Sequence, residues 1–266
     1  APVNLAEKIR AHLIGTTSAT IPTGINQSTE DLQLARKRAY ACWLLEHTES
    51  ATDYAAEMLV AANTMGCDET TSYAFAINAA NEIRRDQFDA AKISLQISND
   101  IDEAYAGGHA SIWPARAQLR NCANTLPWFE GLDHAISMLN DEVNNAYKTH
   151  DYESWLYGTS AHSVNSLVRG VELSNLKQAT QQRAKQQLHS AYNYGANLPQ
   201  FIMQFCDSLT GQTSNVSEPF QFAHPDEDEL AKATIYVLRL YYGVLFNDYT
   251  GARQVLKLAQ QGSCLI

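Results

Sequence analysis

Glycine and proline are scarce in this chain of 266 residues, which contains 13 Gly and 7 Pro. Their usual combined share in globular proteins is roughly 12%. A β-sandwich or barrel needs turn-forming residues every 8–12 residues or so, and the chain has too few of them. Alanine is abundant, with 36 residues. Few helix breakers and many alanines predict an all-α protein.

Charged residues are also sparse, at 18%, and the balance is acidic: 29 Asp and Glu against 19 Lys and Arg give a net charge of −10. Proteins that bind nucleic acid normally carry a basic face. We therefore expect no nucleic-acid partner. Apolar residues make up 45% of the chain, which is enough to offset the entropy of ordering it and excludes general disorder.

No CxxC pair occurs among the five cysteines, Cys42, Cys67, Cys122, Cys206 and Cys264. Their odd number does not suit a fully paired disulfide framework. The pattern favours a reducing compartment, and hence the cytoplasm over secretion. The Ala1 start fits removal of an initiator Met and also cleavage after a signal peptide, so both origins stay open.

Long apolar runs and established catalytic motifs are absent. The longest uncharged stretch, 186–206, contains Asn, Gln, His, Ser and Pro199 and is not a membrane span. No phosphate-binding loop, dinucleotide fingerprint, nucleophile elbow or HExxH motif is found. Eight scattered His include no Glu-x-x-His pair, and the acidic run 226–229 suits the first turn of a helix, where the dipole favours negative charge. We expect neither a metal nor a cofactor.

Helical periodicity dominates what remains. Caps, proline positions and apolar stripes predict about 8–11 helices in one compact domain over residues 1–266, with a right-angled helical repeat array as the alternative architecture. Residues 211–224 are rich in turn formers and predict a surface linker before the C-terminal helix pair. Predicted helices include 128–148, 152–173 and 235–246.

An acid and an aromatic residue precede a new helix at three places, around Phe88, Tyr152 and Tyr249. The spacings of 64 and 97 residues approach two and three units of 32, and helix-pair repeats have such periods, about 34 residues in the tetratricopeptide type. The other signature positions of that repeat are missing. Generic helix-hairpin turn chemistry is therefore the better explanation.

Two residues are weak catalytic candidates. Cys67 lies near a predicted helix N-terminus, which stabilises a thiolate, although Asp68 opposes this effect. His109 follows the pair Gly107-Gly108, and Trp113 comes four residues later. Gly107, Gly108, His109 and Trp113 together predict a binding loop, against the plainer interpretation of a helix stop and restart. Asn247, Asp248 and Tyr249 are typical of a turn, with the rim of a binding site as the alternative interpretation.

These observations favour a non-enzymatic helical module that binds a protein partner. The first alternative is an enzyme with a Cys–His site assembled from distant residues, a hydrolase or transferase. The second is a structural subunit of an assembly, such as a homo-oligomer, because 13 Tyr and 4 Trp are residue types that favour interfaces.

The last helix pair gives the most specific packing prediction. Ile235, Leu238, Tyr242 and Leu245 share one face of a helix and should point into the core. Leu256 on the final helix should meet them. Arg239 lies off this stripe and should tolerate substitution.

Overall fold

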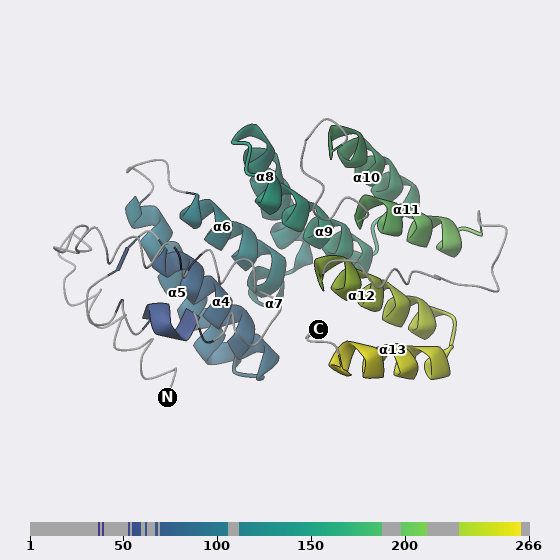
Figure 1. Ribbon diagram of the computed structural model, residues 1–266, viewed down its shortest axis with the longest axis horizontal. Helices are drawn as coiled ribbons and strands as arrows, with labels where there is room; N and C mark the ends of the chain where they lie inside the picture. The colour runs from purple at the N-terminus through teal and green to yellow at the C-terminus, as the bar shows by residue number, and fades with distance from the viewer. Residues whose placement is uncertain are drawn as a thin grey trace. The chain divides into compact units, whose positions relative to one another are not determined.

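The described part of the computed structural model is α-helical (Figure 1). The structure describes residues 70–105, 112–187, 198–211 and 229–261, together with residues 37, 39, 53, 55–59, 62, 67 and 68. Helix accounts for 87% of this part, which contains no strand. The all-α prediction is confirmed. Gly107, Gly108, His109 and nearly all of the predicted linker 211–224 lie outside the described residues.

The chain divides into two compact units, Ala1–Met138 and Leu139–Ile266. The single-domain interpretation of residues 1–266 stays a prediction. The boundary falls inside helix α8 (Leu132–Lys148).

The first unit is built around helix α4. From residue 70 onward its helices are α4 (Thr71–Arg84), α5 (Phe88–Tyr105), α6 (Trp113–Arg120), α7 (Leu126–Phe129) and the start of α8, with a π-helical segment η1 (Asn121–Thr125) between α6 and α7. Helix α4 packs against α5, α6 and η1. This explains why nearly every residue of α4 is buried, including Tyr73, Phe75 and Ile77. Small Ala residues at 74, 76, 79 and 80 are buried among these neighbours.

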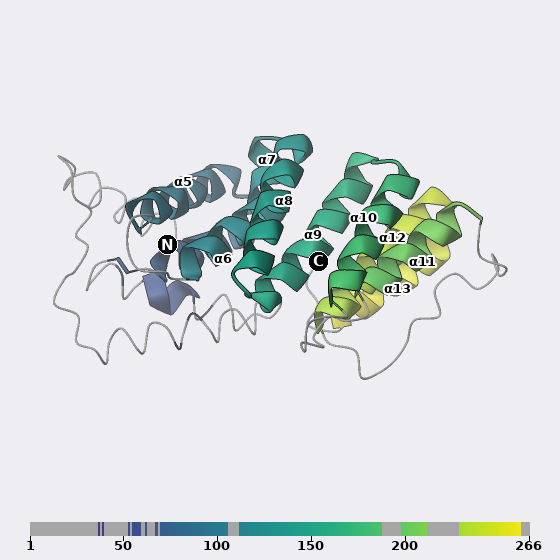
Figure 2. The same ribbon diagram turned by 90° about the horizontal axis from the view of Figure 1, so that it is seen from above.

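The second unit is built around helix α9. Besides the rest of α8, it contains α9 (Tyr152–Arg169), α10 (Leu173–Gln187), α11 (Leu198–Leu209), α12 (Glu229–Leu245) and α13 (Tyr249–Gln261). Helix α9 contacts α10, α11 and α12, and within the described part of this unit the pairs α10–α11 and α12–α13 have the most extensive contacts (Figure 2). Trp155 and Leu156 of α9 are almost fully buried.

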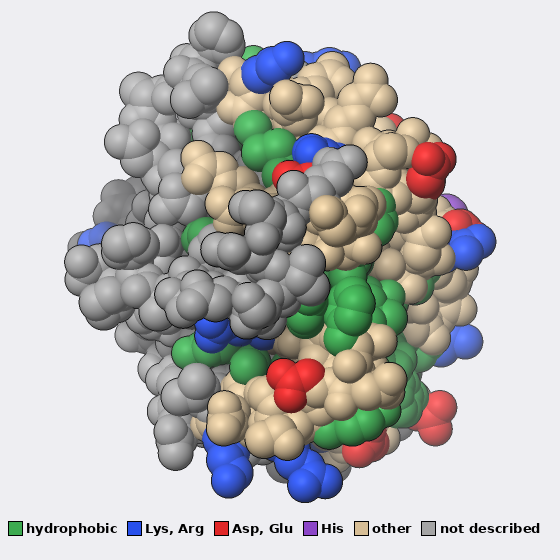
Figure 3. Space-filling model, turned by 90° about the vertical axis from the view of Figure 1, so that its right-hand side faces the viewer, with side chains coloured by type: hydrophobic (Ala, Val, Ile, Leu, Met, Phe, Trp, Pro, Cys, Tyr) green, Lys and Arg blue, Asp and Glu red, His purple; other side chains and the backbone are tan. Residues whose placement is uncertain are grey.

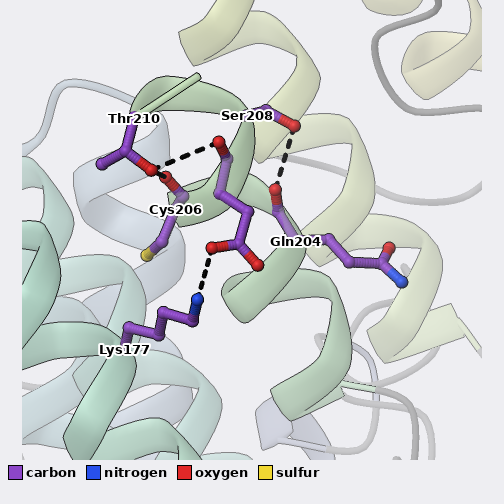
Figure 4. A network of polar contacts seen from close by, with 6 residues as sticks. Lys177, Gln204, Cys206, Ser208 and Thr210 are labelled. Carbon is purple, nitrogen blue, oxygen red and sulfur yellow. Dashed lines mark hydrogen bonds and ion pairs between the residues drawn. The ribbon is translucent and has the colours of Figure 1, made fainter. Parts of the chain in front are cut away.

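A polar contact joins the α10–α11 pair. The Lys177 ammonium of α10 donates to the Asp207 carboxylate of α11 (Figure 4). At the end of α11, the Thr210 hydroxyl donates to the Cys206 carbonyl at 2.9 Å, which satisfies one of the carbonyls that a helix end leaves free. The Cys206 side chain itself is buried.

Three helices end in the same left-handed turn. Asp86, His150 and Asn247 have φ angles of 57°, 62° and 57°. At Asp86 and His150 the hydrogen bonds form a Schellman motif, in which the next amide reaches back five residues, as from Asp151 to the Ala146 carbonyl at 3.0 Å. Since an aromatic residue begins the following helix in all three cases, turn chemistry accounts for the sequence echo. The repeat array stays a prediction.

The packing prediction for the last two helices is partly wrong. Ile235, Leu238 and Tyr242 are buried as expected, but Leu245 in the final turn of α12 is 49% exposed. The apolar stripe is therefore covered along most of the helix and uncovered at its end. On α13, Leu256 is exposed and its neighbour Val255 is the buried residue.

Two predicted helix boundaries also need correction. The expected helix 128–148 is interrupted at Gly131, whose φ of 84° is left-handed, so α7 and α8 are separate helices. The expected helix 152–173 ends at Arg169, because Gly170 at φ 82° forms a Schellman C-cap.

Candidate functional site

Cys67 lies just before α4 and is half-buried. Burial, with a smaller contribution from the charge of Asp68, raises the pKa of the Cys67 thiol to about 11. A nucleophilic cysteine needs a lowered pKa. The Asp68 carboxylate forms hydrogen bonds within its own turn: its Oδ1 accepts from the Thr70 amide at 2.8 Å and from the Thr70 hydroxyl at 2.6 Å. These contacts fix the start of α4.

Trp113 is a core residue at the start of α6. Its side chain is buried, and its ring lies 5.5 Å from that of Tyr73. The Arg116 guanidinium lies over the Trp113 ring at 5.3 Å. The rest of the predicted loop, at Gly107, Gly108 and His109, lies outside the described residues, so the binding loop stays a prediction.

The predicted residues Asn247, Asp248 and Tyr249 form the exposed turn between α12 and α13. Asp248 Oδ1 accepts a hydrogen bond from the Gly251 amide at 2.9 Å, in the manner of an N-cap. The Tyr249 hydroxyl donates to Asn247 Oδ1 at 2.9 Å. These contacts fix the turn and leave the Tyr249 ring at the surface.

Large apolar side chains gather around this turn. We call Val244, Leu245, Phe246, Tyr249 and Leu256 the apolar tip. Each is between 43% and 57% exposed, and the tip contains five of the ten exposed large hydrophobic residues in the described part of the chain. Figure 3 shows apolar side chains collected on the face of the molecule that includes this end of α12 and α13.

Sequence reasoning missed most of the tip because it treated the whole helix as core. A signal was present in the three consecutive residues Val244-Leu245-Phe246. Successive helical residues point about 100° apart, so three in a row cannot all face the same neighbour. The ring of Phe246 packs on that of Tyr242, with centroids 4.4 Å apart, while about half of its surface stays exposed.

Basic side chains border the tip on α13. Arg253 and Lys257 are exposed and lie four and eight residues after Tyr249, so they share its face of the helix with Leu256. The nearby acid Asp248 already caps α13. Although the whole chain is acidic, this face of α13 therefore presents an apolar surface with a positive edge.

A second polar feature lies inside the first unit. We call Ser72, Asn78, Glu82, Ser94, Ser98, Asn121 and Thr125 the polar seam between α4, α5 and η1. The Glu82 carboxylate accepts hydrogen bonds from Asn78 Nδ2 at 2.9 Å and from the Ser94 hydroxyl at 2.8 Å. Burial outweighs these contacts and raises the pKa of Glu82.

Apart from Asn78, which is partly exposed, the polar seam is closed to solvent. Asn121 Nδ2 donates to Ser98 Oγ at 2.9 Å, and that hydroxyl donates to the Ser72 carbonyl at 3.0 Å. Glu82, Ser94 and Ser98 have no exposed surface. A substrate could not reach these groups without helix separation, so the arrangement suits a core that fixes the register of α4 on α5.

Within the described residues, no group of three or more His, Cys, Asp or Glu side chains could hold a metal ion. None of the helices that the structure describes is long and apolar enough to cross a membrane. Comparisons with family models, with curated proteins and with solved structures find no match to this chain.

Proposed function

We propose that this chain is a non-enzymatic protein-binding module and that the apolar tip of α12 and α13 is its binding surface. The observation that carries the proposal is that four large exposed apolar side chains flank the turn between α12 and α13, with the exposed Leu256 two helical turns further along α13. Scattered apolar residues are normal on a protein surface, whereas a cluster of this kind usually marks an interaction site.

The charge of α13 indicates the partner. Arg253 and Lys257 are exposed on the same face of α13 as Tyr249 and Leu256. An amphipathic helix with apolar anchors and flanking Asp or Glu residues would match both the tip and its positive edge. The occupant that we propose is therefore an acidic amphipathic helix of another protein.

A pair of designed peptides tests this proposal. Both peptides form the same amphipathic helix with Leu and Phe anchors, but one carries Glu and the other Lys at the flanking positions. We expect the Glu peptide to bind at least about tenfold more tightly in calorimetry, which corresponds to about 1.4 kcal/mol. Equal affinity for the two peptides would contradict the proposal that the positive edge of α13 selects an acidic partner.

Tip variants provide the second arm. Leu245→Ser with Phe246→Ser should abolish binding of the Glu peptide while leaving the helical circular dichroism unchanged. Val168→Ser on α9 is the matched control, because Val168 is equally exposed and lies outside the tip. If sedimentation shows a dimer that the tip variant dissociates, a second copy of the chain is the occupant and the proposed partner is wrong.

A further inference from the structure

An arginine in the second unit has only neutral partners. Arg183 of α10 is half-buried. Its Nη1 lies 3.0 Å from Nδ1 of His162 on α9, and its Nη2 donates to Oδ1 of Asn140 on α8 at 3.0 Å. Within the described residues no carboxylate lies within ion-pair distance of this guanidinium, and its pKa is lowered by burial alone. Cations that lose contact with water are normally paired with an anion.

The geometry also fixes the state of His162. A guanidinium can only donate hydrogen bonds, so Nδ1 of His162 must accept and the ring proton must be on Nε2. Burial and then the charge of Arg183 lower the pKa of His162 to about 4. Near neutral pH the imidazole is therefore uncharged, and Arg183 supplies a single positive charge at this place.

Two of the five N–H donors of Arg183 are held by His162 and Asn140, and the remaining three have no partner in the described part of the chain. The two held contacts restrict the guanidinium, so less side-chain entropy is lost when an anion binds. A carboxylate matches the planar fork of donors. Its single charge also balances one guanidinium, whereas a phosphate dianion would bring a second, uncompensated charge.

We propose that Arg183, held by His162 and Asn140 at the junction of α8, α9 and α10, is a binding site for a carboxylate. The ligand is a small carboxylate molecule or the side chain of Asp or Glu in a partner. This site is independent of the apolar tip, and neither proposal requires the other.

Nuclear magnetic resonance of the full chain at pH 7 tests the proposal. We expect sodium acetate to produce a saturable shift of the Arg183 Nε–H and His162 ring nitrogen signals, half-complete at on the order of 10 mM because one contact gives weak binding. Sodium chloride at equal ionic strength should not do so. Absence of a saturable acetate shift, or an equal shift with chloride, would overturn the proposal.

Variants and other anions complete the experiment. Arg183→Gln should abolish the shift at His162, and Arg183→Lys should weaken acetate about fivefold because an ammonium lacks the fork. A response that persists in Arg183→Gln would refute the site.

Acetyl-glutamate amide identifies the source of the carboxylate. Tighter binding of this compound than of acetate indicates an acidic side chain of a partner, and equal binding indicates a small carboxylate molecule. Stronger binding of inorganic phosphate than of acetate would contradict the charge match.

If Arg183→Gln unfolds the chain, His162→Gln serves in its place. Glutamine retains an acceptor for the guanidinium, so the Arg183 Nε–H signal should still shift with acetate in this variant. A loss of that shift in folded His162→Gln protein would show that the site does not act as proposed.

Discussion

At the scale of single residues, burial decides which side chains are available for chemistry. Cys67 and Cys206 have pKa values raised to about 11, in both cases mainly by burial. His162 is held neutral by its surroundings and accepts a hydrogen bond from Arg183. These three side chains are therefore in environments that suppress nucleophilic attack and proton transfer near pH 7.

Thiol labelling checks this environment. A thiol with a pKa near 11 is ionised about three hundredfold less at pH 7.5 than a free cysteine with a pKa near 8.5. We expect iodoacetamide to modify Cys67 at least about a hundredfold more slowly than it modifies a model peptide. Mass spectrometry of the timed digest measures the rate, and the urea-unfolded chain gives the reference. Rapid native labelling of Cys67 would revive the Cys–His enzyme alternative.

A second prediction compares two leucines on one stripe of α12. Leu238 has no exposed surface, whereas Leu245, two turns later, is 49% exposed. Leu238→Ala should lower the free energy of unfolding by about 2–5 kcal/mol, and Leu245→Ala by less than about 1 kcal/mol. Urea denaturation measures both. Equal losses would mean that the end of α12 is covered in solution.

Helices are where the sequence predicted most. Alanine content, caps and apolar periodicity predicted an all-helical chain because these signals act within one or two turns. Pro114 in the first turn of α6 is a local signal of the same kind. Local signals cannot show how far a neighbouring helix extends and therefore which positions of a stripe it covers. Leu238 and Leu245 have the same position in the periodic pattern, and only tertiary packing makes one core and the other surface.

The same reason explains the outcome for the candidate sites. The turn Asn247-Asp248-Tyr249 was found from its residue types, because turn chemistry is local. The contact of Arg183 with His162 and Asn140 joins three helices over as many as 43 positions in the sequence. No pattern within a single helix could have indicated it.

Close packing between α12 and α13 gives a prediction at the scale of a helix pair. A Cβ atom added at Gly243 would lie 2.9 Å from the Cβ of Ala252 and 3.1 Å from the Asp248 carbonyl oxygen. Inside a helix, Gly→Ala normally stabilises by about 1 kcal/mol. Here the two helices would have to separate, so we expect Gly243→Ala to destabilise the chain by about 1–3 kcal/mol.

A double variant separates the two effects. Ala252→Gly removes the closest atom, so Gly243→Ala with Ala252→Gly should be more stable than the sum of the two single changes predicts. Thermal and urea unfolding of all four proteins would measure this coupling. A higher melting temperature for Gly243→Ala alone would contradict the close approach of the two helices.

At the scale of the whole molecule, the two units contain buried titratable groups that act in opposite directions. Glu82 in the first unit has a raised pKa, mainly because burial disfavours its charge. Its ionised form costs stability at neutral pH, and this cost disappears as the pH falls through the raised pKa toward 4.5. Acidification over that range should therefore stabilise the first unit.

His162 in the second unit has the opposite effect. Its pKa is lowered from 6.5 to about 4, so between these values the unfolded chain binds a proton that the folded chain does not. The stability that this group contributes is complete above pH 6.5 and is lost as the pH falls toward 4, at up to about 1.4 kcal/mol per pH unit. Through His162, acidification over that range should destabilise the packing of α9 in the second unit. Glu142 on α8, whose pKa is raised by burial and by the charge of Asp141, contributes in the opposite direction.

Amide hydrogen exchange can follow both units in one sample. Between pH 6.5 and 4.5, after correction for the intrinsic pH dependence of exchange, we expect protection of the buried α9 amides to fall and that of the α4 amides to hold or rise. His162→Gln should flatten the response of α9, and Glu82→Gln should flatten that of α4, because each change removes one titrating group. Parallel losses of protection in α4 and α9 would show that the chain opens as one cooperative unit. The titrations of Glu82 and His162 would then both change the same free energy of opening.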